Sequence, residues 1–301
     1  MDLIGAGLTP LEGGYSGETF LAEAAGEQSV VRIYGERSSW RGPHAVDVDA
    51  ALLRLTRGLL PVAQVLEVRR PAPESGLPAL LVTSRLPGER LDLVLASASE
   101  ELTREIARGL GVLLARLGQI PFLHAGLFTD GQLQVEPMPA GANDLEDWVK
   151  THLRDTALES WSPADQAGLA SVAGVAHDLL DDVDRVCLVH SDFNPKNLLV
   201  DPVSGEITGL VDWEFAHAGS PYADLGNLLR FERSPDFVAA VLEAYVDRAP
   251  AVPANLVDLA RSADLWALVE LASRRDANPV AARAHDQLLA IARTRDLHAL
   301  P

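Results

Sequence analysis

The segment "VCLVHSDFNPKNLLV", residues 186–200, constrains the fold of this chain more than any other stretch. An apolar run leads into a polar loop, residues 190–197, which begins with His190 and ends with Asn197, and a second apolar run follows. Polar side chains are costly to bury without partners. A polar loop between two apparently buried strands therefore predicts either a hydrogen-bonded turn or a site for a ligand.

The segments on either side of the polar loop predict two lobes of different structure. Residues 1–86 contain β-branched runs separated by glycine turns, with helical spacing of apolar residues only over 46–60. After the break in "RLPGER" the pattern is mainly helical, with helices expected near 102–117, 164–181, 235–247, 255–275 and 279–296. We expect an α+β fold, with a small antiparallel-sheet lobe over 1–86 and a larger helical lobe over 87–301.

The charge of the chain limits the partners that it can bind. Its 43 acidic and 25 basic residues give a formal net charge of −18, which argues against a nucleic-acid ligand. An acidic surface suits a small cationic substrate, although it also serves solubility alone. No apolar run reaches membrane-spanning length and the N-terminus lacks a leader pattern, so we expect a cytoplasmic protein without a membrane partner.

The spacing of three polar residues indicates phosphate chemistry. Asn197 follows Asp192 by five residues, and Asp212 follows Asn197 by fifteen. The segments "NLLVD" and "ITGLVDW" read as a hairpin, which would bring these side chains together. Oxygen ligands of this kind suit Mg²⁺ and a polyanion. In phosphoryl transfer one carboxylate holds the metal and another orients the acceptor hydroxyl, so Asp212 and Asn197 suit the first task and Asp192 the second.

The motif "HSDFNPKN" resembles the H-x-D-x-x-x-x-N catalytic loop of eukaryotic-like kinases, in the form found in the aminoglycoside phosphotransferase and choline kinase superfamily. The segment "GLVDWEFAHAGSPYADLGNLL" resembles that superfamily's counterpart of the protein-kinase D-F-G segment, and the likeness extends over residues 8–250. It implies a two-lobed protein-kinase-like fold that uses Mg²⁺ and ATP, with GTP not excluded. Asp192 would be the catalytic base, Asn197 and Asp212 the metal ligands, and His190 and Asp224 structural supports of the loop.

The same resemblance implies a nucleotide site in the first lobe. The turn "EGGYSGETF" would cover phosphates, although a plain hairpin turn fits it as well. Arginine in "VVRIY" stands where protein kinases carry a phosphate-pairing lysine, and its partner would be Asp49 or Asp47. Lys196 fits either a phosphate contact or a surface position. The expected nucleotide-binding residues are Gly14, Ser16, Gly17, Arg32, Asp49, Ser84 and Leu86.

The acceptor is expected to be a small cationic molecule bearing a hydroxyl group. Carboxylates near an aromatic ring suit an amine-rich substrate, although a charged helix face around core aromatics is an alternative. The candidates for substrate contact are Glu214, Glu232, Trp266 and Glu270. We predict an ATP-dependent O-phosphotransferase that modifies an antibiotic, an aminoglycoside or a basic cyclic peptide such as capreomycin or viomycin, and so confers resistance.

Other functions stay open from the sequence. A metabolic kinase for choline, homoserine or a sugar has the same motifs. A nucleotide-binding module without turnover is less consistent with the intact Asp192, Asn197 and Asp212. A metal-dependent hydrolase using His190 and Asp192 would need further ligands at short spacing, which the sequence does not offer nearby. The chain is expected to be a monomer or a homodimer.

Overall fold

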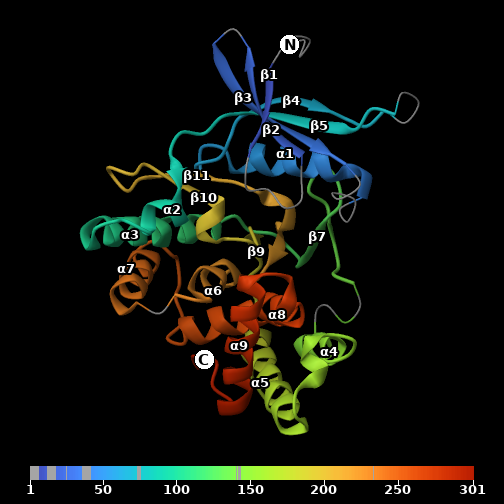
Figure 1. Cartoon of the computed structure of the whole chain (residues 1–301), viewed down its shortest axis with the longest axis vertical. Coiled ribbons are helices and arrows are strands. Elements are labelled where there is room, and N and C mark those ends of the chain that lie inside the picture. Colours follow the sequence, from blue (N-terminus) through green and yellow to red (C-terminus); the bar gives the residue numbers. More distant parts are fainter. Residues whose placement is uncertain are drawn as a thin grey trace.

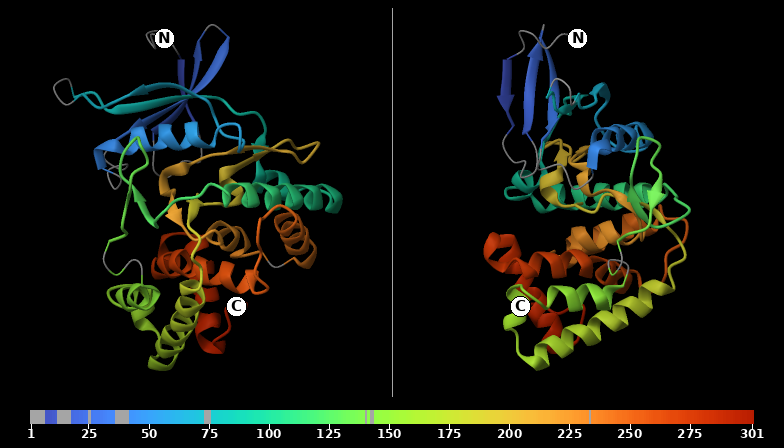
Figure 2. Two further views of the ribbon diagram at one scale, coloured as in Figure 1. Left: turned by 180° about the vertical axis from the view of Figure 1, so that it is seen from behind. Right: turned by 90° about the vertical axis from the view of Figure 1, so that its right-hand side faces the viewer.

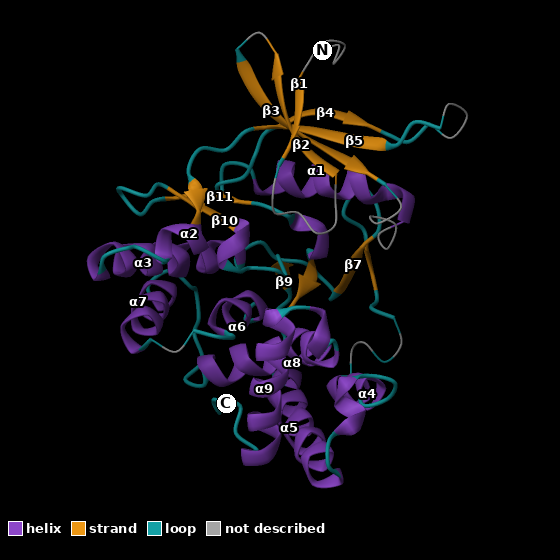
Figure 3. Ribbon diagram, in the orientation of Figure 1, coloured by secondary structure: helices purple, strands orange, loops and turns teal. Residues whose placement is uncertain are grey.

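The computed structural model describes residues 7–11, 18–24, 26–35, 42–72, 76–139, 141, 144–232 and 234–301. A sheet-rich lobe occupies one end of the molecule and a helical lobe the other, and the C-terminus lies in the helical lobe (Figures 1 and 3). The two views in Figure 2 show the same division from behind and from the side. The predicted two-lobed α+β fold is confirmed.

The first lobe is an antiparallel sheet with one helix beneath it (Figure 1). Its strand order is β1-β2-β3-β5-β4, and every neighbouring pair runs antiparallel. Alternation along β3 buries Val31, which is 2% exposed. The elements are β1 (Gly7–Pro10), β2 (Glu18–Ala24), β3 (Glu27–Tyr34), α1 (Ala45–Thr56), β4 (Val65–Arg69) and β5 (Ala79–Ser84).

Helix α1 is shorter than the apolar spacing predicted. It ends at Thr56, and Arg57 already has an extended backbone. Gly58 follows with φ of +85°, a conformation that favours glycine and turns the chain away from the helix axis. Leu59, within the range expected to be helical, is 53% exposed in this turn. Val48 and Leu52 lie on the buried face of the helix, as the apolar spacing predicts.

The link between the lobes runs from β5 to β6 (Glu89–Arg90) through Gly88. Gly88 has φ of +102°, and a Cβ atom there would lie 2.3 Å from the hydroxyl oxygen of Thr208. Only glycine fits this approach. β6 then pairs with β10 (Leu198–Val200), which pairs with β11 (Ile207–Leu210) with Leu198 opposite Leu210. The hairpin expected after the polar loop is therefore present.

The helical lobe agrees with the five helices expected from periodicity, and the structure adds shorter elements to it. Its helices are α2 (Leu91–Leu95), α3 (Glu100–Leu117), α4 (Leu145–His152), α5 (Pro163–Asp181), α6 (Ala223–Leu229), α7 (Pro235–Val246), α8 (Leu256–Ser273) and α9 (Pro279–Thr294). Short 3₁₀ turns are η3 (Ala157–Ser160), η4 (Pro195–Asn197), η5 (Trp213–Phe215) and η6 (Arg275–Ala277). One core runs from α1 through α3 to α7, and a second lies among α4, α5, α8 and α9.

A small sheet of order β8-β7-β12-β9 lies at the centre of the molecule. Its strands are β7 (Gly126–Phe128), β8 (Val135–Glu136), β9 (Cys187–Val189) and β12 (His217–Gly219). All three residues of β9 are buried, and burial raises the pKa of the Cys187 thiol to about 12. The fixed end of β9 carries the chain directly into the polar loop.

Candidate active site

The backbone at the start of the polar loop is held from below by a buried carboxylate. The oxygens of Asp224, at the start of α6, accept hydrogen bonds from the N–H groups of His190 and Ser191, each at 2.8 Å. Ser191 has φ of +69°, an unfavourable conformation for a residue with a side chain. The two hydrogen bonds that Asp224 of α6 accepts hold the backbone at His190 and Ser191 in place.

Asp224 is only 5% exposed, and this burial controls the ionisation of its carboxyl group. Desolvation raises its pKa to about 7, against the two backbone hydrogen bonds, which lower it. The charges of Asp192 and Asp264 raise it further. The carboxyl group beneath the loop therefore titrates close to neutral pH.

His190 braces the loop by hydrogen bonds at both ring nitrogens. Its Nδ1 accepts from the backbone N–H of Asp192 at 3.3 Å, so the proton resides on Nε2, which donates to the carbonyl of Val211 at 3.0 Å. The ring also packs edge-on against Trp213 at a centroid distance of 4.8 Å. This geometry connects the polar loop with the residue that follows β11 and occupies both ring nitrogens of His190 with backbone groups.

Two asparagine amides orient the carboxylate of Asp192. Asn197 Nδ2 donates to its Oδ2 at 2.6 Å, and Asn194 Nδ2 donates to its Oδ1 at 2.7 Å. Asn197 Nδ2 also donates to the carbonyl of Asp192 at 2.9 Å. Because the amide nitrogen of Asn197 is used in this way, its amide oxygen is the atom that can face a metal ion.

Asp212 lies beside Asn197 because of the hairpin. The N–H of Val211 donates to the carbonyl of Asn197 at 2.9 Å, and Asp212 follows with φ of +64°. This left-handed residue lies after β11 and is the N-cap of η5. Asn197 thus forms a hydrogen bond with Asp192 and is joined through its backbone to the residue that precedes Asp212.

Arg32 of β3 reaches across from the sheet-rich lobe to these acids. Its Nη1 lies 3.0 Å from Asp212 Oδ1, and its Nη2 lies 2.6 Å from Glu214 Oε2. Burial acts to lower the pKa of Arg32, but the charges of Asp49 and Asp212 outweigh it and raise that pKa. The guanidinium therefore stays charged and links the two lobes at the site.

The carboxylate of Asp49, expected to pair with Arg32, forms a hydrogen bond with Tyr34. Asp49 Oδ2 accepts from the hydroxyl of Tyr34 at 2.6 Å, while its charge also acts on Arg32. Asp47, the other candidate, is bonded by Arg70 at 3.0 Å. Of the two, Asp49 is the one that lies by Arg32. Tyr34 was not predicted, although it follows Arg32 by two residues and so shares its face of β3.

A cleft of about 380 Å³ opens in front of these groups, between the lobes. Its apolar lining comes from both lobes and includes Val30, Leu81, Leu199 and Leu210. Its polar lining includes Arg32, Asp49, Lys196, Asn197 and Asp212. Ser84 and Leu86, where the chain passes between the lobes, also line it. An apolar slot that ends in charged groups suits a flat base at one end and phosphates at the other.

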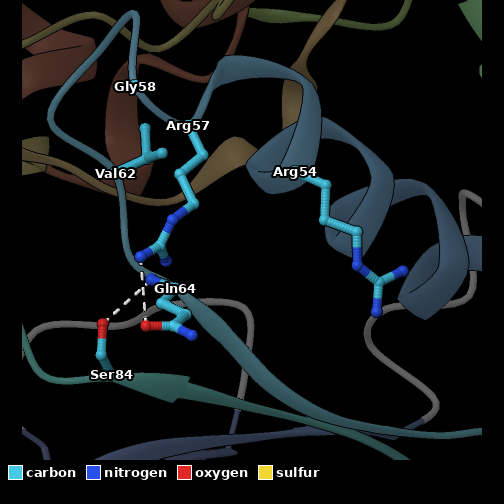
Figure 4. A pocket seen from close by; sticks show the side chains of 6 residues that line it. All are labelled: Arg54, Arg57, Gly58, Val62, Gln64 and Ser84. Carbon is cyan, nitrogen blue, oxygen red and sulfur yellow. Dashed lines mark hydrogen bonds between the residues drawn. The ribbon is translucent and has the colours of Figure 1, made fainter.

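A second, open hollow of about 610 Å³ lies near the end of α1 (Figure 4). Arg57 donates to Gln64 Oε1 at 3.1 Å there, and the N–H of Gln64 donates to the Ser84 hydroxyl at 2.9 Å. Arg54 also lines it, and no carboxylate does. The smaller cleft is the candidate active site, because Asn197 of the polar loop and Asp212 line it.

The side chains near the cleft fit a magnesium ion that is shared with a nucleotide. Asp212, Glu214 and the amide oxygen of Asn197 are hard oxygen donors, and the cation of Arg32 lies between the two carboxylates. Mg²⁺ commonly takes one or two protein ligands and completes its shell with water and phosphate. Among the described residues no group of three or more His, Cys, Asp or Glu side chains is placed to hold a metal ion by itself.

The four expected substrate residues make different contacts. Glu214 joins Asp212 at Arg32, and Glu232 accepts from the N–H of Ser234 at 2.6 Å. Trp266 packs on the second core, and Glu270, further along α8, pairs with Arg274 at 3.0 Å. Three expected nucleotide residues, Gly14, Ser16 and Gly17, lie outside the described residues.

The sequence did not point to a buried ion pair near the loop. Arg230, after α6, donates to Asp264 of α8 through Nε at 2.8 Å and Nη2 at 2.6 Å. Asp192 and Glu270 are among the charges that act on Arg230. An arginine and an aspartate separated by 34 residues give no sequence signal of their pairing.

The fold and the polar loop define a kinase-like phosphotransferase. A profile of the phosphotransferase enzyme family matches residues 7–256, and the chain belongs to this family. The predicted superfamily and enzyme class are thereby confirmed. Among curated proteins, acyl-CoA dehydrogenase family member 11 of Gallus gallus is 33% identical over 57 residues, which are 19% of this chain and 7% of that protein. The chain thus matches only a small part of that relative's length.

Solved structures share the fold at low sequence identity. A protein of Ralstonia eutropha assigned as an aminoglycoside phosphotransferase has a TM-score of 0.70 and 16% identity, over 96% of this chain and 90% of that chain. Aminoglycoside phosphotransferase APH(4)-Ia has a TM-score of 0.67 and 18% identity, over 96% and 94%. Aminoglycoside 2'-phosphotransferase-IIIa, in its GDP complex, has a TM-score of 0.65 and 15% identity, over 96% and 93%.

The described residues include no helix that is long and apolar enough to cross a membrane.

Proposed function

We propose that this protein transfers the γ-phosphoryl group of ATP to a hydroxyl group of a small cationic antibiotic, an aminoglycoside or a basic cyclic peptide, and so confers resistance. The observation that carries the proposal is the contact of Asn197 with Asp192 at 2.6 Å, at the edge of a cleft that Asn197 and Asp212 line. APH(4)-Ia, with the same fold, has been solved with ADP and hygromycin B. The net charge of −18 suits a cationic acceptor.

The contacts around the polar loop support a separate task for each residue in this reaction. The acceptor hydroxyl oxygen bonds to the γ-phosphorus as the bond from that phosphorus to the β,γ-bridging oxygen breaks, ADP leaves, and the hydroxyl proton passes to the Asp192 carboxylate. Asn194 and Asn197 keep that carboxylate aimed. Asp212 and Asn197 would hold Mg²⁺, which neutralises charge on the phosphates. Arg32, on β3 of the sheet-rich lobe, would bind phosphate oxygens.

A screen tests the proposal directly. Purified protein is incubated with ATP or GTP, Mg²⁺ and individual basic antibiotics or primary metabolites, and phosphorylated product is detected by mass. A phosphorylated aminoglycoside or cyclic peptide supports the antibiotic branch. Product from choline, homoserine or a sugar instead identifies a metabolic kinase and refutes the resistance role.

The remaining classes give different outcomes in the same preparation. Nucleotide binding without consumption of ATP across the whole screen would contradict catalysis and identify a binding module. Tightly held zinc, measured by metal analysis, would contradict the magnesium-dependent kinase and favour a hydrolase.

A further inference from the structure

The cleft is lined by more basic than acidic side chains, although the protein as a whole is acidic. Four basic residues line it, Arg32, Arg85, Arg90 and Lys196, against two acidic residues, Asp49 and Asp212. The chain as a whole carries a net charge of −18. A local excess of cations in such a chain indicates that the cleft receives an anionic ligand.

The three arginines are already bonded to side chains of the protein. Arg32 contacts two carboxylates, as described above. Arg85 donates to the amide oxygen of Gln28. Arg90 donates from Nε and Nη2 to the two carboxylate oxygens of Asp92, at 2.9 and 2.6 Å. Each would have to give up or share these bonds in order to hold a ligand.

Lys196 differs from the arginines. Across the described residues, no hydrogen bond or ion pair to its ammonium group is present. Its charge acts on Asp92, whose pKa is lowered chiefly by the hydrogen bond from Arg90 and least by Lys196. Lys196 is exposed at the mouth of the cleft, so its charge is available to a ligand there.

The backbone of Lys196 belongs to the network that orients the base. Its N–H donates to Asn194 Oδ1 at 2.9 Å, and the amide nitrogen of the same Asn194 donates to Asp192. Its neighbour Asn197 donates to Asp192 from the other side. The backbone that carries the Lys196 side chain is therefore held by the same hydrogen bonds that orient Asp192.

We propose that Lys196 binds a phosphate group of the nucleotide and serves as the cation of the helical lobe opposite Arg32. The assignment rests on the proposed phosphotransferase function. Around Arg32, the carboxylates of Asp49, Asp212 and Glu214 outnumber the single guanidinium. Beside a magnesium ion, Lys196 would add a second side-chain cation for the triphosphate, as a point charge on a flexible stem.

The composition of the chain permits a sharp labelling test. The chain contains only two lysines, Lys196 and Lys150. An acyl-phosphate derivative of ATP places a reactive carbonyl at the terminal phosphate; a nearby lysine amine attacks this carbon, forms an amide and releases ATP. Lys150 is an internal control, because it lies on α4 outside the cleft and pairs with Asp147 at 3.0 Å.

We expect mass mapping to show acylation of Lys196 that excess ATP suppresses, and slow labelling of Lys150 that ATP does not change. Two results overturn the assignment and leave the proposed function intact. In the first, Lys196 is labelled but excess ATP does not reduce the labelling. In the second, Lys196 is not labelled although calorimetry shows that the protein binds ADP. Protein that binds neither ADP nor ATP overturns both.

A matched pair of variants gives a second readout. Lys196→Gln should weaken binding of ADP and ATP by about 5- to 20-fold and leave adenosine binding unchanged, because only the phosphates meet the ammonium. Lys150→Gln should bind all three ligands as the parent does. Unchanged ADP and ATP affinity in Lys196→Gln, or an effect on the acceptor KM alone, contradicts a nucleotide contact.

Discussion

The buried carboxyl group of Asp224 makes the stability of this protein depend on pH in an unusual direction. Its pKa rises from 3.8 to about 7 on folding, chiefly through desolvation. The folded state therefore binds a proton that the unfolded state releases between these pH values. The stability that this group contributes is complete below pH 3.8 and is lost as the pH rises through 7.

The magnitude follows from the difference between the two pKa values. At about 1.4 kcal/mol for each pKa unit, a difference of about three corresponds to about 4 kcal/mol. Because the group is fully buried, water does not screen this difference. The linkage relation assigns roughly 3 kcal/mol of it to the interval between pH 5 and pH 8.

The variant Asp224→Asn isolates this effect, because asparagine resembles the neutral acid and does not titrate. Urea unfolding followed by tryptophan fluorescence at pH 5, 6, 7 and 8 gives the free energy of unfolding of both proteins. We expect the variant to gain about 3 kcal/mol relative to the parent between pH 5 and pH 8, whatever the difference at pH 5.

Asp201 provides a matched control for this experiment. Its Oδ1 also accepts two backbone hydrogen bonds, from Val203 at 2.9 Å and Ser204 at 2.8 Å, but these bonds lower its pKa. Its contribution is lost only in acid, so Asp201→Asn and the parent should show parallel profiles from pH 5 to pH 8. A parallel profile for Asp224→Asn as well would refute the argument from burial.

Four further variants, one of them a control, test the site and its support. Arg32→Ala removes the cation that lies 3.0 Å from Asp212 and 2.6 Å from Glu214. Mn²⁺, followed by electron paramagnetic resonance, should therefore bind the nucleotide-free variant about fivefold tighter or more than the parent. Unchanged Mn²⁺ affinity would argue against this pairing. Gly226→Ala places a Cβ atom 1.9 Å from a carbonyl oxygen of α8 and should lower the free energy of unfolding by about 2 kcal/mol. Gly174→Ala, where the nearest atom is 3.4 Å away, should be neutral or stabilising; equal losses would show that crowding is not the cause. Asp264→Ala leaves the buried Arg230 without its partner and should cost about 3–5 kcal/mol in urea unfolding, and a cost below about 1 kcal/mol would mean that water replaces the carboxylate.

Local patterns in the sequence were sufficient to predict the fold class and the hairpin beside the polar loop. Long helices such as α3 and α5 repeat an apolar face over several turns, so their periodicity identifies them. The pairing of Leu198 with Leu210 follows from two apolar runs around a short turn. Strands of two or three residues, such as β7, β8 and β12, are too short to show a period and were missed.

The contacts that join the lobes had no local signal. Arg32 and Asp212 are 180 residues apart, and only the folded chain shows that the arginine meets Asp212 and Glu214. The hydrogen bond of Tyr34 to Asp49 is likewise a consequence of how α1 sits under the sheet. Resemblance indicated which residue types matter, whereas their partners depended on tertiary packing.

The central claim is that the Asp192 carboxylate, held by two asparagine amides, receives the acceptor proton during phosphoryl transfer. The most direct test is single-turnover transfer from ATP to an acceptor found in the screen, measured for the parent and Asp192→Asn alongside the Kd for the magnesium–nucleotide complex. The account predicts a rate that is at least about 100-fold slower with a Kd within a few-fold of the parent. A transfer rate equal to that of the parent would contradict it.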